Sequence, residues 1–194
     1  IEIPASVETI EATAFYACTS LKIVTFEKGS QLKTIGGGYS KPNTYYGAFG
    51  ATKSLATFDM SECTKVAEIG DYAFFCDDNL KEVQLPKRVS SVGKYAFGCT
   101  SPADDDDSED YVTVSSDSGD NLKVKALDGF LLIGYTGAAS DYVKDCDVKI
   151  SFKAMNVNWK AVMLWGILAV VLMAVLLIAI RLIRRNMICL LYTS

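Results

Sequence analysis

Short alternating hydrophobic segments recur along the first half of the chain. In each, a leucine is followed by two hydrophobic residues that stand two positions apart: Val24 and Phe26, then Phe58 and Met60, then Val83 and Leu85. Ile1 and Ile3 hold the same two positions at the start of the chain. Alternation over three residues predicts a short strand with two side chains directed inward.

An Ala-Phe pair follows each of these segments, 11 to 13 positions after its second hydrophobic residue in three units and 22 positions after it in the second unit, which carries an insertion. The pairs lie at 14–15, 48–49, 73–74 and 96–97, with an aliphatic residue five positions before the phenylalanine in three of the four units. We expect this section to form a tight helical or 3-10-like return, in which alanine allows close approach and phenylalanine fills the core. The basic period is 23 residues, and the chain carries about four units.

No single unit of this kind is stable by itself. Each buries about six apolar side chains, worth roughly 1.5–3 kcal/mol each, which does not offset the entropy of ordering the unit. Stacked units share one core, so the periodicity predicts a solenoid.

The unit resembles a known family. IEIPASVETIEATAFYACTSLK at 1–22 and LKEVQLPKRVSSVGKYAFGCTS at 80–101 are similar to BspA-type leucine-rich repeats, with Pro4, Pro86 and Cys18 at matching positions. Glu27 and Ser61 replace the proline in the other units. The resemblance implies a leucine-rich-repeat solenoid of short parallel strands, in a non-enzymatic surface protein of microbes used for adhesion or partner binding.

Beyond the repeats, the composition changes twice. The acidic run SPADDDDSED is expected to be a solvated linker, and calcium binding is a weaker alternative because the run lacks the glycine-turned loop of a dedicated site. Strand-like alternation returns in YVTV, LKVKAL, GFLLIGY and DVKISF, which predicts a β-rich cap for the solenoid and a membrane-proximal stalk.

A membrane span is predicted near the C-terminus. Residues 161–180 contain no charged residue, and a helix of this length crosses roughly 30 Å of hydrocarbon. Arg181, Arg184 and Arg185 follow it, while Trp159 precedes it. Arginine clusters stay on the cytoplasmic side, so we expect a plasma-membrane protein with extracellular repeats and a cytoplasmic C-terminus.

The predicted organisation has five parts. They are repeats at 1–100, a linker at 101–110, the cap and stalk at 111–158, a transmembrane helix at 159–182 and a tail at 183–194. Residues 1–160 carry 16 basic against 23 acidic residues, which disfavours nucleic acid as a partner. Because the chain opens at Ile1 without a leader, we expect missing N-terminal repeats and a signal peptide.

Two surfaces are candidates for partner binding. The outward strand positions form one face, which includes Thr25, Asp59 and Gln84. The insertion GGYSKPNTYYG forms the other candidate, since tyrosine suits binding surfaces. Its candidate residues are Tyr39, Lys41, Tyr45 and Tyr46. The alternatives are a merely solvated face and tyrosines that pack on the neighbouring coil.

The cysteines suggest one bridge. Cys76 and Cys99 hold the same position in adjacent coils, at a spacing compatible with a disulfide, although buried free thiols are the favoured alternative. Cys18, Cys63 and Cys146 show no evident partner in the sequence, and Cys189 is a weaker candidate for palmitoylation. No zinc-ligand spacing occurs, and we expect no metal and no cofactor.

The chain contains no histidine and no phosphate-binding glycine loop, which argues against an enzyme with a small-molecule substrate. Two functions therefore remain: a surface adhesin that binds a protein or cell-surface ligand, and a membrane-tethered scaffold that self-associates. The ectodomain end of a receptor is a further alternative.

Overall fold

A computed structural model describes residues 1–38, 40–41, 44–102, 110–115, 121–155 and 173. Residues 1–155 form one compact unit, and residues 156–194 form another. The predicted span at 161–180 and the tail lie outside the described residues, except for the exposed helical residue Met173. Within the part of the chain that the structure describes, no helix is long and apolar enough to cross a bilayer.

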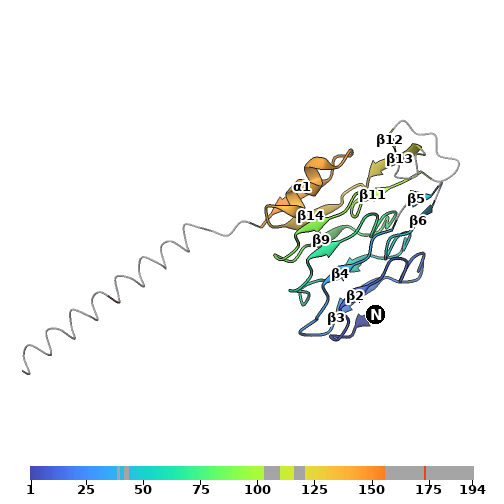
Figure 1. Cartoon of the computed structure of the whole chain (residues 1–194). Helices are drawn as coiled ribbons and strands as arrows, with labels where there is room; N and C mark the ends of the chain where they lie inside the picture. The colour runs from blue at the N-terminus through green and yellow to red at the C-terminus, as the bar shows by residue number, and fades with distance from the viewer. Residues whose placement is uncertain (39, 42–43, 103–109, 116–120, 156–172, 174–194) are drawn as a thin grey trace, which may run out of the picture. The chain divides into compact units, whose positions relative to one another are not determined.

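Parallel strands form one wall of the compact unit (Figure 1). Three strands at the N-terminal side pair in the order β1-β3-β7, and three later strands pair in the order β9-β14-β15. The strands are β1 (Glu2–Ile3), β3 (Ile23–Phe26), β7 (Thr57–Phe58), β9 (Glu82–Gln84), β14 (Leu131–Gly134) and β15 (Ser151–Ala154). The inward residues of β1, β3, β7, β9 and β14 are buried, as the alternation predicted, while Phe152 and Ala154 of β15 are half-buried.

A second wall holds another strand from each coil. The parallel order is β10-β8-β4-β2, made by β2 (Thr9–Ile10), β4 (Thr34–Ile35), β8 (Glu68–Ile69) and β10 (Ser91–Val92). The sequence predicted one strand per coil, so this sheet is an addition. Only one residue of each of these two-residue strands points inward, which is too short an alternation to distinguish from a turn.

The Ala-Phe sections form the third wall as tight turns with 3-10-like hydrogen bonds between residues three positions apart, but in these described residues they form no regular helix. Thr13, Tyr72 and Tyr95 have positive φ angles of 65°, 56° and 49°, which interrupt a right-handed helix. Backbone donors alternate between bonds within the coil, such as Tyr16 N–H to Thr13 O at 3.1 Å, and bonds to the next coil. Phe15 N–H donates to Ala48 O at 2.7 Å, and Phe49 N–H donates to Ala73 O at 2.8 Å.

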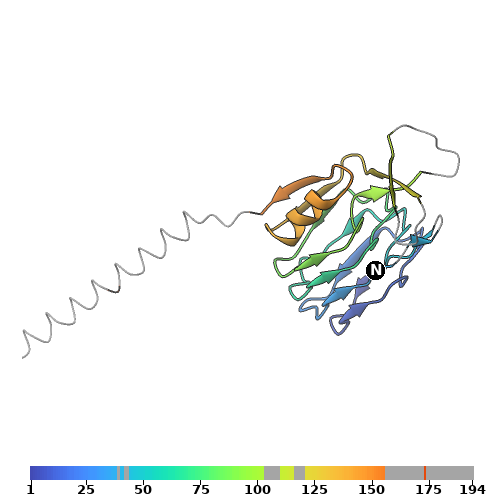
Figure 2. The same ribbon diagram turned by 45° about the horizontal axis from the view of Figure 1, so that its top comes forward.

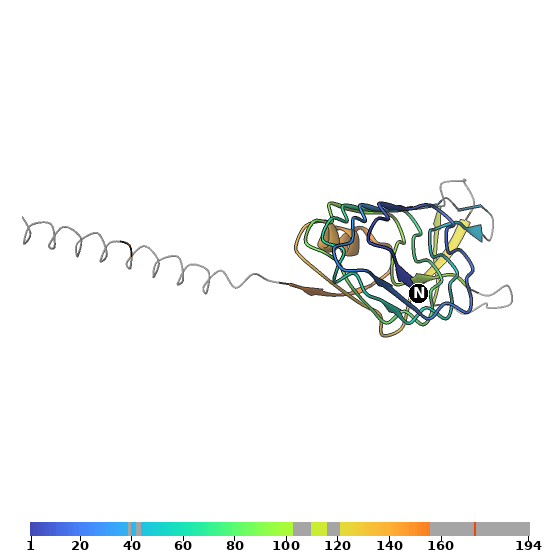
Figure 3. The same cartoon turned by 90° about the horizontal axis from the view of Figure 1, so that it is seen from below.

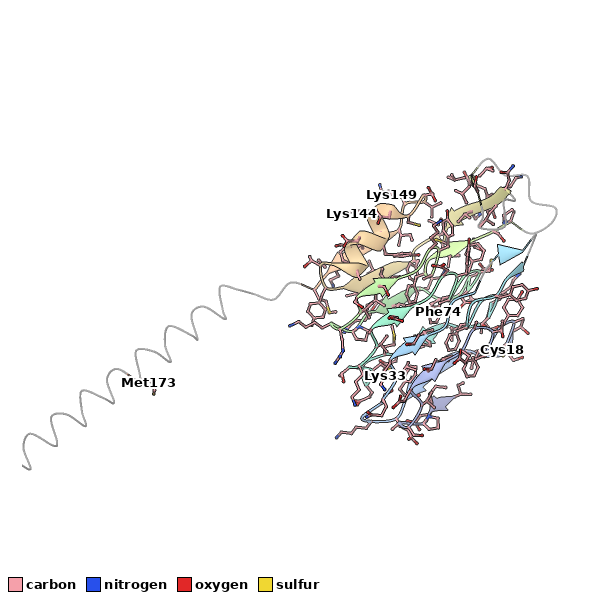
Figure 4. All side chains as sticks on the ribbon, in the orientation of Figure 1. Cys18, Lys33, Phe74, Lys144, Lys149 and Met173 are labelled. Carbon is pink, nitrogen blue, oxygen red and sulfur yellow. The ribbon has the colours of Figure 1, made fainter. Side chains whose placement is uncertain are left out.

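The phenylalanines of these turns stack through the centre of the unit. Ring centroids are 4.9 Å apart for Phe15 and Phe49, 5.0 Å for Phe49 and Phe74, and 4.7 Å for Phe74 and Phe97. Figure 4 shows Phe74 in the middle of the stack, with Cys18 and Lys33 nearer its margins. Seen along the stack, the coils lie nearly over one another (Figure 3). The repeated Ala-Phe pair therefore supplies one rung per coil.

Glycines let the coils approach at the end of the second wall. A Cβ built at Gly70 would lie 2.2 Å from the nitrogen of Gly37 and 2.4 Å from its Cα. Real Cβ atoms do not approach backbone this closely, so any other residue would push the two coils apart.

Two hairpin-like additions flank the walls. One pairs β5 (Ser40–Lys41) with β6 (Thr44–Tyr45) in antiparallel fashion inside the predicted tyrosine insertion. The other is an antiparallel sheet of order β11-β13-β12, built from β11 (Cys99–Thr100), β12 (Val112–Ser115) and β13 (Asn121–Ala126). The acidic run between β11 and β12 lies largely outside the described residues.

The predicted β-rich cap contains a helix, α1 (Ala138–Asp145), which the sequence interpretation missed. Gly137 and Ser140 begin it with two reciprocal hydrogen bonds, at 3.0 and 2.8 Å. Ala139 and Tyr142 are its buried residues, at the three-residue spacing of a helix face. In Figure 2, α1 lies across the end of the stack beside β14 and β15, and residues 131–154 thus extend the coils directly.

Tyr142 of α1 completes the last rung. Its ring meets Phe97 edge-on at 6.5 Å between centroids. Its hydroxyl donates to Phe97 O at 2.5 Å and accepts from Phe97 N–H at 2.9 Å. One side chain therefore replaces the backbone partner that a further Ala-Phe turn would offer.

Candidate functional site: a groove between two strands of the solenoid

A groove of about 960 Å³ opens on the first wall between β7 and β9. The strands on either side pair with their other neighbours, but within the described residues no backbone hydrogen bond joins β7 to β9. The first wall is thus two three-stranded sheets with a seam, and the groove lies along that seam.

Pro86 helps to explain the seam. At the equivalent position of an earlier coil, Glu27 N–H donates to Ile3 O of the preceding coil at 3.0 Å. Pro86 has no N–H and makes no such bond to the coil before it. The corner that connects the first wall to the second wall also shortens here, since Val66 follows Met60 by six positions while Val89 follows Leu85 by four. The groove lies where the long corner is followed by the short one.

The floor of the groove is apolar and its rims are charged. Phe58, Met60 and Leu85 line it and are almost fully buried. Tyr135 and Met155, from the later coils, close one end and are half-buried. An apolar floor beneath polar rims is the usual make-up of a ligand or peptide site.

Charged groups of both signs stand on the rims. Lys87 Nζ lies 5.9 Å from the ring centroid of Tyr135, a cation–π distance. Lys81 Nζ donates to two backbone carbonyls, at 3.2 and 3.3 Å. Among the described residues, the side chains of Arg88 and Glu82 make no hydrogen bond or ion pair, so both exposed groups are available to a partner.

The structure brings together two of the three predicted strand-face residues. Asp59 and Gln84 are exposed and line the same groove. Asp59 Oδ1 also accepts from Ser61 N–H at 2.9 Å, which fixes the carboxylate at the rim. Thr25 is half-buried, donates to Ile1 O at 3.4 Å and does not line the groove.

The tyrosine insertion is described only in part. Tyr39 lies outside the described residues, and of Lys41 and Tyr45 only the backbone, in β5 and β6, is described. Tyr46 is half-buried, and its ring lies 5.5 Å from that of Tyr16 in the neighbouring coil. Neither alternative for this insertion is decided.

The sequence did not predict that Lys87 and Arg88 form a basic rim of the groove. It also did not predict that Tyr135 and Met155 line the groove. A signal existed for the first pair, because they follow Pro86 directly in the shortened corner. No local signal existed for Tyr135 and Met155, which join the groove only because β14 and β15 extend the same wall.

All five described cysteines are free thiols, the alternative that the sequence favoured, but Cys99 and Cys146 have a neighbour that the sequence did not suggest. Cys76 lies near Ser101, with 3.6 Å between Sγ and Oγ, while Cys99 lies beside Cys146, for which the sequence offered no partner. Burial raises the pKa of the Cys63 thiol to about 11, so this residue stays protonated in the core.

Comparison with known proteins agrees with this architecture. The model of the BspA type leucine rich repeat region matches residues 1–105 in six copies, where the Ala-Phe pairs gave about four units. The chain therefore belongs to this family, as the resemblance implied. Repeats of this family generally serve in protein binding or surface adhesion. No curated protein and no solved structure matches the chain.

Proposed function

We propose that the chain is a single-pass, membrane-anchored surface protein that binds protein partners through the groove between β7 and β9, without enzymatic activity. The observation that carries this proposal is the seam itself, where an apolar floor and unpartnered charged groups lie together on a repeat wall. Membership of a repeat family used for binding supports it.

An extended peptide segment fits the groove best. Because β7 and β9 remain close neighbours, the segment is expected to lie along the groove rather than between the two strands. The floor formed by Phe58, Met60 and Leu85 suits apolar side chains, and Arg88 suits an acidic one. The partner segment is therefore expected to combine hydrophobic residues with a carboxylate.

The anchor rests on residues 161–180, whose uncharged length matches a bilayer. The arginines that follow favour an extracellular repeat region and a cytoplasmic C-terminus in the plasma membrane. In this arrangement the groove faces the cell's surroundings, where a host or neighbouring cell supplies the partner.

A peptide library tests the groove. We would select phage-displayed random peptides on the full chain held in detergent, and then measure the affinity of the enriched peptides. The double variant Lys87→Glu with Arg88→Glu is expected to weaken binding by about 10-fold or more, because it places like charges opposite an acidic peptide and about 1.4 kcal/mol is a factor of ten. The matched control is Lys28→Glu with Lys149→Glu, two exposed lysines that do not line the groove.

Equal affinity of both double variants for the selected peptides would contradict the groove as the binding site. Competition by the chain itself, with a sedimentation shift to dimers, would instead support the self-associating scaffold.

Antibodies test the location. An antibody to residues 1–100 should stain intact cells, and a probe of the tail at 183–194 should stain only permeabilised ones. Staining of both only after permeabilisation would place the repeats inside the cell, and the surface-adhesin function would then be wrong.

A further inference from the structure

Cys99 and Cys146 are neighbours in space although 47 positions separate them in the chain. Their Sγ atoms lie 3.9 Å apart. Cys99 belongs to β11, directly after the Phe97 rung, and Cys146 is the residue that ends α1. The two thiols therefore lie across the junction between the last Ala-Phe turn and the helix that covers it.

We propose that Cys99 and Cys146 form a disulfide that fastens α1 to the last coil of the solenoid. Both side chains already face each other, and closing the remaining gap to the roughly 2.05 Å of a disulfide requires only side-chain rotation and a small shift of the chain after α1. The bond would close a loop that contains β12, β13 and β14 as well as α1.

The two cysteines differ in how far solvent and small oxidants can reach their sulfur atoms. Cys99 is fully buried, whereas Cys146 is half-buried and lines a cleft of about 390 Å³ between β10 and α1. A small oxidant therefore reaches Cys146 first. The hydrogen bond between the two thiols lowers the pKa of Cys146, and that same bond, together with burial, raises the pKa of Cys99.

The reaction is a thiol–disulfide exchange with a low-molecular-weight disulfide as oxidant. The Cys146 thiolate attacks one sulfur of the oxidant, forms a mixed disulfide and releases one thiolate of the oxidant. The Cys99 sulfur, after loss of its proton, then attacks the Cys146 sulfur and displaces the second thiolate. Two cysteine thiols are oxidised, and one oxidant disulfide is reduced to two thiols.

The cleft carries Asp141, Asp145 and Asp147 on its lining. These acids disfavour an anionic oxidant, so the uncharged bis(2-hydroxyethyl) disulfide is expected to react faster than oxidised glutathione. Formation of the bond in the cell rests on the exported location proposed above, because exported proteins meet an oxidising environment. The purified chain tests the pairing without that assumption.

Peptide mapping of the purified full chain identifies the bond. After treatment with bis(2-hydroxyethyl) disulfide, alkylation of free thiols and tryptic digestion without reduction, we expect a linked pair made of peptides 95–123 and 145–149. The linked mass lies about 2 Da below the sum of the two peptides, since two hydrogens are lost. A link between 66–81 and 95–123 would show that Cys76 is the true partner of Cys99.

Stability gives a second measurement. Oxidation is expected to raise the thermal midpoint by roughly 5–15 °C relative to the chain held in reductant. Cys146→Ser should abolish this difference, and Cys76→Ser, the matched control, should retain it. Alkylated thiols at both Cys99 and Cys146 after oxidation, or an unchanged dependence on reductant in Cys146→Ser, would overturn the proposal.

Discussion

At the scale of single residues, polar side chains in the turn after the Ala-Phe pair tie neighbouring coils together. Thr52 Oγ1 donates to Phe15 O of the preceding coil at 2.8 Å, and Thr52 N–H donates to Asp77 Oδ1 of the following coil at 2.7 Å. Both side chains are fully buried. Asp77 Oδ2 has no partner among the described residues, so this carboxyl is only half satisfied.

Asp77→Asn is expected to stabilise the protein at neutral pH. Burial raises the pKa of Asp77 well above its usual range, whereas the bond from Thr52 N–H opposes this only in part. The neutral form therefore favours folding. Its contribution is complete below the unfolded pKa near 4 and is lost as pH rises through the folded pKa.

Urea unfolding checks this prediction. At about pH 7.5 the free energy of unfolding of Asp77→Asn should exceed that of the unmodified chain by roughly 1–2 kcal/mol, and the gap should shrink toward zero near pH 4. Asp128→Asn, an exposed carboxyl, serves as the control with no change. A difference that does not depend on pH would mean that the charge of Asp77 is not what destabilises the fold.

At the scale of elements, each coil contributes a rung whose value depends on its place in the stack. Phe74 is fully buried and stacks on Phe49 and Phe97, whereas Phe15 is half-buried and, among the described residues, stacks on Phe49 alone. Phe74 also meets Phe58 of the first wall edge-on at 4.6 Å between ring centroids. The phenylalanines in the middle of the stack therefore join the third wall to the first wall.

Phe74→Ala is expected to cost about 3–5 kcal/mol of unfolding free energy, because it removes a buried ring and leaves a cavity. Phe15→Ala should cost less than half as much, since its ring is partly exposed already. Chemical denaturation followed by far-UV circular dichroism measures both. Equal losses would contradict the continuous ladder as the main source of stability.

Tyr142→Phe tests the cap at the end of the ladder. The ring remains, but Phe97 loses the partner of its buried N–H and C=O, which should cost about 1–3 kcal/mol. Amide exchange of α1 and β11 should accelerate, while exchange in β2 and β4 should stay the same. Tyr135→Phe is the matched control, because its hydroxyl makes no hydrogen bond among the described residues.

At the scale of the whole molecule, a repeat unit and a predicted anchor share one chain. The unit at 1–155 has its own hydrophobic core, whose residues run from Ile3 to Ile150 along the sequence. The residues after it carry the longest uncharged stretch of the sequence. The proposed binding and the proposed anchoring therefore fall on separate segments.

Deleting residues 159–182 is expected to move the chain from the membrane fraction to the supernatant of an ultracentrifugation run, without changing the circular dichroism of the repeat region. Replacing the same stretch with an unrelated membrane helix should restore sedimentation with membranes. A deletion variant that stays in the membrane fraction after a carbonate wash would show that another segment holds the protein there.

Much of the fold could be predicted from the sequence because its determinants repeat. The alternation at Val24 and Phe26, and again at Val83 and Leu85, reports burial within a single short strand. In the same local way, each Ala-Phe pair identifies the phenylalanine that stacks in its coil. By contrast, α1 was not predicted from the sequence, because the helix has only eight residues and just two of them are buried.

The sequence by itself determined the solenoid, its family and the strand register between coils. The reason is that each coil contains its own alternating strand residues and Ala-Phe pair within about 23 residues. Only the tertiary structure decided the groove, because Arg88 and Met155 become neighbours through the stacking of separate coils. It also decided the meeting of Cys99 with Cys146, which lie 47 positions apart. Local patterns encode which side chains turn inward, whereas contacts between distant segments depend on how the coils and their cap pack.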